Sequence, residues 1–211
     1  MSLTPTTLRE YDREAPDADE TETATFALGC FWGPEAQFGA LGGVVRTRVG
    51  YAGGTKPDPT SHALGDHTEV FQVDFHPGTI SYADLLEVVF RSHSPQRQSR
   101  KTQYQHVVFA ATPAQRETLD DYLAANGLSP DDVETRIEQL GRFTPAEAYH
   151  QTHRLRSRPA LVDAFDAADY DDEELRESPA AAKLNGYAGG HDLPESDDLA
   201  TIVAETAQGR G

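Results

Sequence analysis

The sequence predicts an α+β protein with a ferredoxin-like (split βαβ) core and a long irregular C-terminal wrap. Three observations support this fold class. Short apolar or alternating runs, typical of strands, lie between amphipathic runs that begin with good helix caps. The first six runs follow the order β-α-β-β-α-β, which is that of a split βαβ unit. After residue 141 the pattern breaks into short pieces.

The first half of the core is predicted from local patterns. Its expected elements are a strand over 23–29, a helix over 33–41 and strands over 44–52 and 68–77. The two later strands alternate apolar and polar residues, which is the strand period. Pro34 suits a first helical turn, and Glu35 favours the positive end of the helix dipole. A Gly- and Pro-rich stretch over 53–66 predicts a loop.

The second half of the core repeats this logic. Its expected elements are a helix over 82–92, a strand over 105–111, a helix that ends near Gly127 and a strand over 133–140. Ser81 is a good N-cap for the first helix, whose apolar residues form one stripe. Thr112 and Pro113 cap and open the second helix.

The composition excludes some classes of partner. The 211 residues hold 35 Asp and Glu against 18 Lys and Arg, for a formal net charge of −17. Such a surface repels nucleic acids and anionic membranes. It suits a protein that works in concentrated salt, where self-repulsion is screened. An ordinary acidic cytosolic protein is the alternative interpretation.

Three segments are expected along the chain. We expect residues 1–21 to form an acidic flexible arm and residues 22–190 to form the folded domain. Residues 191–211 are expected to form an acidic flexible tail. No apolar stretch approaches 18 residues and no signal peptide is recognised, so we expect a cytoplasmic protein. A single cysteine agrees with a reducing compartment. Nothing marks an interface, so a monomer is the default expectation.

Cys30 is the residue most indicative of chemistry. It lies in GCFWG (29–33), between a predicted strand and a predicted helix start. A helix N-terminus stabilises a thiolate and lowers the pKa of its thiol, and the thiolate is the nucleophile. Phe31 and Trp32 place two large rings beside the sulfur. This surrounding favours a reactive cysteine over a buried structural one.

Seven segments together resemble one known family. They are GCFWGPEAQF (29–38), VGYAGG (49–54), HTEVFQVDF (67–75), ISYADLLEVVFRSH (80–93), TQY (102–104), FTPAEAYHQ (143–151) and KLNGY (183–187). In this order they resemble the A-type peptide methionine (S)-S-oxide reductases, across about 22–190. The resemblance implies a ferredoxin-like α+β catalytic domain with a long coiled C-terminal segment. It also implies reduction of methionine-S-sulfoxide, free or in proteins.

The resemblance also assigns roles to residues. Cys30 matches the nucleophile, and Glu69 matches a buried acid that protonates the sulfoxide oxygen. The remaining matches bind substrate: the hydroxyls of Tyr51 and Tyr104 hold the oxygen, and the rings of Phe31 and Trp32 take the S-methyl group. His150, with Glu147 nearby, is expected either to support the site or to be a histidine on a helix surface.

One segment departs from the family. The stretch 94–103 is about five residues shorter, and Ser99 stands where the family carries an Asp five residues before the TQY tyrosine. Three basic residues (Arg97, Arg100 and Lys101) crowd it instead, and a nearby positive charge would stabilise ionised Glu69. Asp66 or Asp74 are candidate substitutes. The departure motivates an alternative: a degenerate paralogue that binds sulfoxides or senses oxidant through Cys30 without efficient turnover.

No bound cofactor or metal is expected. With no second cysteine in the sequence, an oxidised Cys30 requires an external thiol, such as thioredoxin or a small intracellular thiol. His62, Asp66, His67 and Glu69 lie within eight residues, but no second ligand cluster accompanies them, so a polar loop is the preferred interpretation. A Cys/His hydrolase is a third alternative with little support, since no histidine lies in a recognisable catalytic motif.

Overall fold

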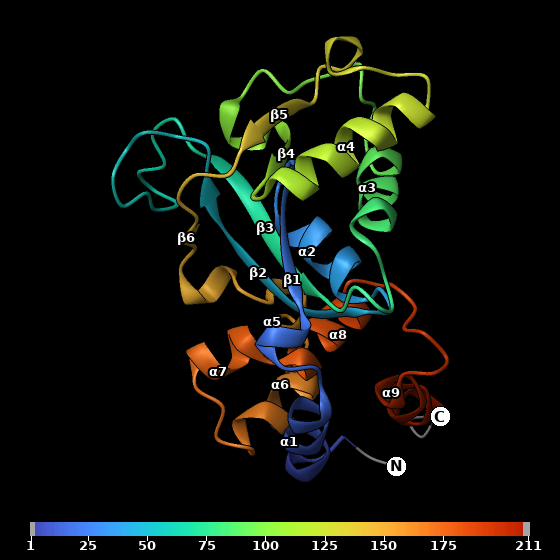
Figure 1. The fold of residues 1–211 in the computed structure, drawn as a ribbon. Coiled ribbons are helices and arrows are strands. Elements are labelled where there is room, and N and C mark those ends of the chain that lie inside the picture. Colours follow the sequence, from blue (N-terminus) through green and yellow to red (C-terminus); the bar gives the residue numbers. More distant parts are fainter. Residues whose placement is uncertain (1–2, 209–211) are drawn as a thin grey trace.

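The computed structural model describes residues 3–208, with side chains described to residue 204. Within these residues, six strands form one mixed sheet. They are β1 (Glu22–Leu28), β2 (Val44–Ala52), β3 (Thr68–Phe75), β4 (His106–Ala110), β5 (Arg136–Gln139) and β6 (Thr144–Pro145). The order across the sheet is β5-β4-β1-β3-β2-β6 (Figure 1). Neighbours are antiparallel except β4 and β5, which are parallel.

Helices connect the strands and then dominate the C-terminal part. They are α1 (Pro5–Glu14), α2 (Trp32–Gly39), α3 (Tyr82–Arg91), α4 (Pro113–Ala125), α5 (His153–Arg156), α6 (Pro159–Asp166), α7 (Asp172–Glu177), α8 (Pro179–Ala188) and α9 (Asp198–Gln208). Helix α2 connects β1 to β2, and α3 connects β3 to β4. The predicted α+β class is confirmed.

The main core lies between one face of the sheet and helices α2, α3 and α4. Phe26 of β1 packs 5.9 Å from Phe38 of α2 and 5.9 Å from Phe71 of β3, measured between ring centroids. The predicted caps are present, since the Ser81 hydroxyl accepts the Asp84 N–H of α3 at 3.1 Å. A smaller apolar cluster covers the opposite face of the sheet.

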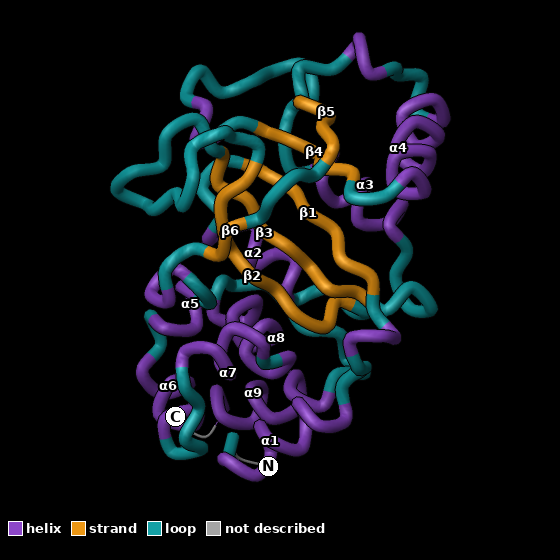
Figure 2. The backbone as a smooth tube through the Cα atoms, turned by 60° about the vertical axis from the view of Figure 1, so that its left-hand side comes forward, coloured by secondary structure: helices purple, strands orange, loops and turns teal. Residues whose placement is uncertain are grey.

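Helices α1 and α5 to α9 form a second, all-helical part of the molecule, which we call the helical layer. It lies below the sheet in both views, with α1 and α9 within it (Figures 1 and 2). Its own apolar cluster joins all six helices. Helix α8 packs directly on α2, and a Cβ at Gly39 would collide with the Ala182 carbonyl. Glycine at position 39 therefore permits this close contact.

The helical layer corrects two predictions. The flexible arm expected over 1–21 contains α1, whose Leu8 is fully buried in the layer. The flexible tail expected over 191–211 contains α9, which buries Leu199, Ile202 and Val203. Their spacing places these three side chains on one helix face. Burial of this face stabilises the helix in spite of the acidic composition of the segment. The two predictions also cover residues 1–2 and 209–211, which lie outside the described residues.

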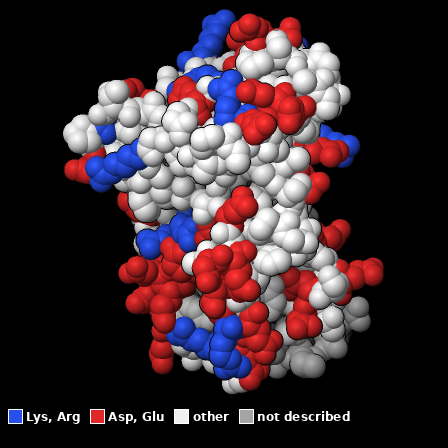
Figure 3. All heavy atoms as spheres, in the orientation of Figure 1, with Lys and Arg blue, Asp and Glu red and all other residues white. Residues whose placement is uncertain are grey.

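The C-terminal wrap is likewise more regular than predicted, because short helices make up most of it. Asp and Glu gather over the helical layer on the face drawn in Figure 3, where Lys and Arg are fewer. No helix within the described residues is long and apolar enough to cross a membrane.

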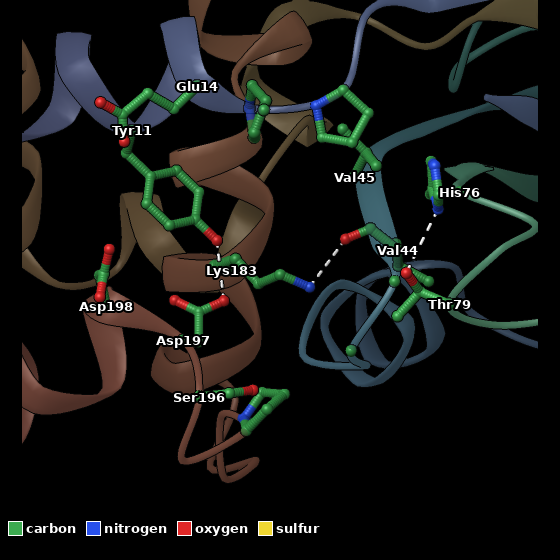
Figure 4. Close-up of a pocket in the computed structure, with 16 residues that line it drawn as sticks. Tyr11, Glu14, Val44, Val45, His76, Thr79, Lys183, Ser196, Asp197 and Asp198 are labelled. Carbon is green, nitrogen blue, oxygen red and sulfur yellow. Dashed lines mark hydrogen bonds between the residues drawn. The ribbon is translucent and has the colours of Figure 1, made fainter. Parts of the chain in front are cut away.

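A cavity of about 480 Å³ lies between the helical layer and the sheet. Tyr11, His76 and Lys183 are among its lining residues (Figure 4). The Lys183 ammonium, 4% exposed, donates to three carbonyls at the end of α2 and the start of β2, those of Gly39, Leu41 and Val44. Its bonds are thus structural, and no predicted site residue lines this cavity.

Candidate active site

The turn between β1 and α2 presents Cys30 to solvent. Gly29 adopts φ +80°, a left-handed conformation that favours glycine, and it turns the chain out of the strand. Cys30 follows with its side chain exposed, and α2 begins two residues later at Trp32. The sequence prediction of a cysteine between a strand and a helix start is confirmed.

The environment of the thiol differs from the sequence prediction. Desolvation by the surrounding side chains raises the pKa of Cys30, and the negative charge of Glu69 raises it further. The backbone N–H of Trp32 and the charge of Arg154 lower it, but they do not prevail. The helix start lowers the pKa as predicted, through the Trp32 N–H, but desolvation outweighs this effect, so the net shift is opposite to the predicted one. At neutral pH the resting site holds a thiol.

Glu69 lies on β3 and is only 7% exposed. Its Oε2 accepts the backbone N–H of Phe31 at 3.2 Å, and its Oε1 accepts the side-chain amide of Gln103 at 2.6 Å. Desolvation raises the pKa of Glu69, while these two donors lower it. Its burial shows that Glu69 is not a solvated residue at a strand edge. Gln103 is a functional candidate that the sequence analysis missed, although it lies inside the quoted TQY segment.

Tyr51 stands directly across from Glu69 in the β2–β3 ladder. Its hydroxyl donates to Glu147 Oε2 at 2.8 Å, and Glu147 Oε1 accepts both the N–H and the hydroxyl of Ser61 at 2.9 Å. Although desolvation opposes it, these hydrogen bonds lower the pKa of Glu147 to about 2. Glu147 therefore remains ionised and orients the Tyr51 hydroxyl.

Tyr104 closes the site from another segment. It ends the short 3-10 helix Thr102–Tyr104, and its side chain is half-buried. Desolvation and then the charges of Glu69 and Cys30 raise the pKa of Tyr104. Tyr104 is thus coupled electrostatically to both groups that are proposed to react.

The rings of Phe31 and Trp32, which we call the aromatic wall, are flanked by two histidines. The His150 ring lies 5.3 Å from Phe31 and 5.6 Å from Trp32, between centroids, so His150 belongs to the site. His153 stacks on Trp32 with centroids 3.7 Å apart and planes 9° apart. Trp32 Nε1 and both His150 ring nitrogens are buried without a hydrogen-bond partner among the described residues. The sequence analysis missed His153, which only the three-residue spacing from His150 could have indicated.

The divergent stretch 94–103 carries basic residues that were expected to stabilise ionised Glu69, but it does not have this effect. The Ser99 hydroxyl bonds the backbone of Lys101 and closes its own turn. The groups that shift the pKa of Glu69 include neither arginine of this stretch. The side chains proposed as substitutes are engaged elsewhere: Asp74 binds Arg48 at 2.8 Å, and Asp66 binds the backbone of the 53–66 loop.

The polar residues near Glu69 form hydrogen bonds that hold this loop. His67 Nδ1 accepts the Gly54 N–H at 3.3 Å, and its Nε2 bonds the Lys56 carbonyl at 2.8 Å. Asp66 accepts the N–H and the hydroxyl of Thr55. Within residues 3–208, no group of three His, Cys, Asp or Glu side chains is arranged to bind a metal ion.

Known proteins share this sequence and architecture. The sequence profile of the peptide methionine sulfoxide reductase family matches residues 22–181. Peptide methionine sulfoxide reductase A5 of Oryza sativa subsp. japonica is 40% identical over 82% of this chain and 70% of its own length. Peptide methionine sulfoxide reductase MsrA of Haloquadratum walsbyi is 41% identical over 63% of this chain and 82% of its own length.

Two solved structures have a similar fold. Methionine sulfoxide reductase A of Corynebacterium diphtheriae superimposes with a TM-score of 0.56 at 32% identity, covering 66% of this chain and 76% of that one. Reduced Mxr1 from Saccharomyces cerevisiae gives a TM-score of 0.56 at 29% identity, covering 68% and 88%. The family profile, the relatives and the structures agree. The chain belongs to the peptide methionine sulfoxide reductase family, as a member of its A type.

Proposed function

We propose that this chain reduces methionine-S-sulfoxide to methionine with Cys30 as the nucleophile and Glu69 as the acid. The observation that carries the proposal is that the backbone next to Cys30 is hydrogen-bonded to the Glu69 carboxyl. Phe31 follows Cys30 directly and donates its N–H to the buried Glu69 at 3.2 Å. Membership of the reductase family supports the same chemistry.

The chemical step balances with the groups of the site. The sulfur of Cys30 attacks the sulfoxide sulfur, and the oxygen passes to Cys30 as methionine leaves. Methionine sulfur is reduced and Cys30 is oxidised to a sulfenic acid. Glu69 donates its proton to the substrate oxygen and regains one from the Cys30 thiol, so the protons balance and the oxygen never leaves as free oxide. Desolvation supports this role, because it raises the pKa of Glu69 and favours the protonated carboxyl.

The surrounding residues fit the substrate. Tyr51 and Tyr104 are placed to hold the sulfoxide oxygen, one beside Glu69 in the ladder and the other coupled to it by charge. The aromatic wall takes the S-methyl group through sulfur–aromatic contact. The unpartnered nitrogens of Trp32 and His150 offer further hydrogen bonds to a bound polar ligand.

Recycling requires a second molecule. Cys30 is the only cysteine in the sequence, so no second cysteine of these 211 residues can resolve the sulfenic acid. An external thiol forms a mixed disulfide with release of water, and a second thiol then restores Cys30. Thioredoxin or a small intracellular thiol would serve. This demand fits the reducing cytoplasm, with residues 22–190 as the catalytic domain of a monomer.

Single-turnover reduction tests the proposal. Pre-reduced protein is mixed with a methionine-S-sulfoxide peptide in high salt, and both products are followed by mass spectrometry. We expect about one methionine per protein and Cys30 as sulfenic acid. Folded protein that yields no methionine and keeps an alkylatable Cys30 would overturn the proposal and favour a binding or sensing role.

Two variants assign the roles. Cys30→Ser removes the nucleophile and should abolish methionine formation. Glu69→Gln keeps the size of the side chain but not its proton, and it should slow the single turnover by roughly 10²-fold with the fold intact. Retained turnover in Cys30→Ser would exclude the mechanism.

A further inference from the structure

Glu35 is the most deeply buried carboxyl of the site region. It lies on α2, three residues after Trp32, and has no exposed surface. The sequence predicts only that Glu35 favours the positive end of the helix dipole. Its Oε1 instead accepts the backbone N–H of Thr152 at 3.1 Å, across the contact between α2 and α5. A buried carboxyl at this junction requires a reason beyond solubility.

The segment that Glu35 holds is strained. Thr152 adopts φ +49° and ψ +43°, a left-handed conformation that is costly for a β-branched residue. Its neighbour Gln151 is anchored on the other side, because the Gln151 side chain bonds both the N–H and the carbonyl of Val49. Such a conformation persists only where the surroundings fix it. The Glu35 bond is one of these fixing contacts.

This strained turn carries the two rings beside the aromatic wall. His150 lies two residues before Thr152, and His153 directly follows it. Because His153 is stacked 3.7 Å from Trp32, the backbone angle at Thr152 sets where the imidazole meets the indole. A change in that angle would move His153 off Trp32 and free the indole to turn.

We propose that Glu35 is a positioning residue, which acts through the Thr152 turn and His153 to fix Trp32 for the sulfoxide's S-methyl group. This inference rests on the proposed function. It deepens that function by adding a residue that does not touch the substrate.

A complementary amide suggests how to test the link. Glu35 Oε2 and Asn185 Nδ2 of α8 are buried without a hydrogen-bond partner among the described residues, yet the Asn185 amide lowers the pKa of Glu35. The Asn185 amide therefore influences the Glu35 carboxyl without a hydrogen bond between them. Asn185 Oδ1 meanwhile accepts the Leu155 N–H of α5 at 3.0 Å. Both side chains thus hold the same short helix.

Exchanging the two functional groups provides the critical variant. Glu35→Gln keeps an oxygen for the Thr152 N–H, but it replaces the carboxyl that Asn185 influences by a second amide donor. The double variant Glu35→Gln/Asn185→Asp restores one amide and one carboxyl at these two positions. The side chain at position 35 keeps an oxygen for the Thr152 N–H, and the side chain at position 185 keeps one for the Leu155 N–H. If Glu35 only filled space, the single and the double variant should have the same spectrum and the same kcat/KM.

Trp32 provides the readout, because it is the only tryptophan in the sequence. Its fluorescence reports the stack with His153 directly, and His153→Ala defines the signal of an unstacked indole. We expect Glu35→Gln to give the His153→Ala spectrum and to lower kcat/KM for a methionine-S-sulfoxide peptide at least ten-fold. The double variant should restore both towards wild type.

Asp12→Asn is the matched control. Asp12 also accepts hydrogen bonds inside the molecule, from Ala180 N–H at 2.8 Å and the Tyr170 hydroxyl at 2.7 Å, but these lie in the helical layer. Its variant should lose stability and keep the wild-type spectrum. A wild-type spectrum in Glu35→Gln, no recovery in the double variant, or an equal spectral change in Asp12→Asn would each overturn the inference. Because fluorescence needs no turnover, an inactive wild type would count against the proposed function alone.

Discussion

At the scale of single residues, burial opposes the ionisation of both groups that are proposed to react. Desolvation raises the pKa of both Cys30 and Glu69, and the charge of Glu69 adds to the effect on the thiol. The proposed reaction needs both protons, since one leaves the nucleophile and one must reach the sulfoxide oxygen. A fully ionised pair would supply neither. The resting thiol thus fits the reaction better than a permanently ionised one.

Gln103 should tune the acid. Its amide donates to Glu69 and lowers the pKa of that carboxyl, so Gln103→Ala should raise this pKa further. The protonated form of Glu69 is lost as pH rises through its pKa, and the alkaline decline that it causes should therefore move to higher pH. The measurement is the single-turnover rate as a function of pH.

A neighbouring glutamine is the control for this prediction. Gln105 bonds the Ser99 carbonyl and Arg136 from the same segment, without contacting Glu69. Gln105→Ala should leave the alkaline decline in place. A decline that moves to lower pH in Gln103→Ala would contradict the assignment of Glu69 as the acid.

The motifs predicted the residues of the site better than its electrostatics. Cys30, Phe31 and Trp32 are adjacent in the sequence, so one motif places all three. The net direction of the Cys30 pKa shift was not predicted, because burial and the charge of Glu69, a residue of β3, outweigh the Trp32 N–H. Such long-range contacts are invisible to local patterns. His153 was missed for the same reason.

At the scale of elements, the helical layer supports the nucleophile helix. Helix α2 is packed between the sheet and α8, and Lys183 of α8 binds the carbonyls at its C-terminal end. Asp12 of α1 in turn accepts the N–H of Ala180, in the first turn of α8. Through these contacts the N-terminal helix stabilises the part of the molecule that positions Cys30.

Leu8→Ala tests whether α1 is part of the fold. Leu8 is fully buried, so the substitution should lower the free energy of unfolding by about 2–5 kcal/mol. Thr6→Ala, at an exposed position of the same helix, should change it by less than about 0.5 kcal/mol. Urea unfolding followed by circular dichroism measures both. Equal stabilities for the two variants would indicate a loosely attached arm.

Elements with clear periodicity were predicted well. The 44–52 strand matches β2, and the 82–92 helix matches α3 to within one residue. Helices α1 and α9 were not predicted, because acidic and proline-containing composition outweighed their few apolar residues in the sequence analysis. Those few residues pack against one another across the two ends of the chain. Only the folded structure brings them together.

At the scale of the whole molecule, the net charge of −17 opposes compaction. Screening at higher salt should relieve this repulsion, since the Debye length falls from about 10 Å at 0.1 M to about 3 Å at 1 M. We expect the Tm to rise by roughly 5 °C over this range of KCl, equivalent to about 2 kcal/mol. Differential scanning calorimetry checks the value.

A charge variant separates screening from other effects of salt. Glu117 and Asp121 are exposed on α4, one turn apart. Replacing both by lysine reduces the net negative charge by four, so the dependence of the Tm on salt should become weaker. An unchanged dependence would show that charge repulsion does not limit stability.

The pairing of Tyr51 with Glu69 across β2 and β3 has a consequence for how the enzyme can be altered. Their spacing is set by the strand ladder, while the intervening loop over 53–66 is attached outside it. Insertions or exchanges in that loop that keep Ser61, whose bonds to Glu147 help to orient Tyr51, should therefore leave the two groups in place. The hairpin thus tolerates change in its loop without change in its reaction centre.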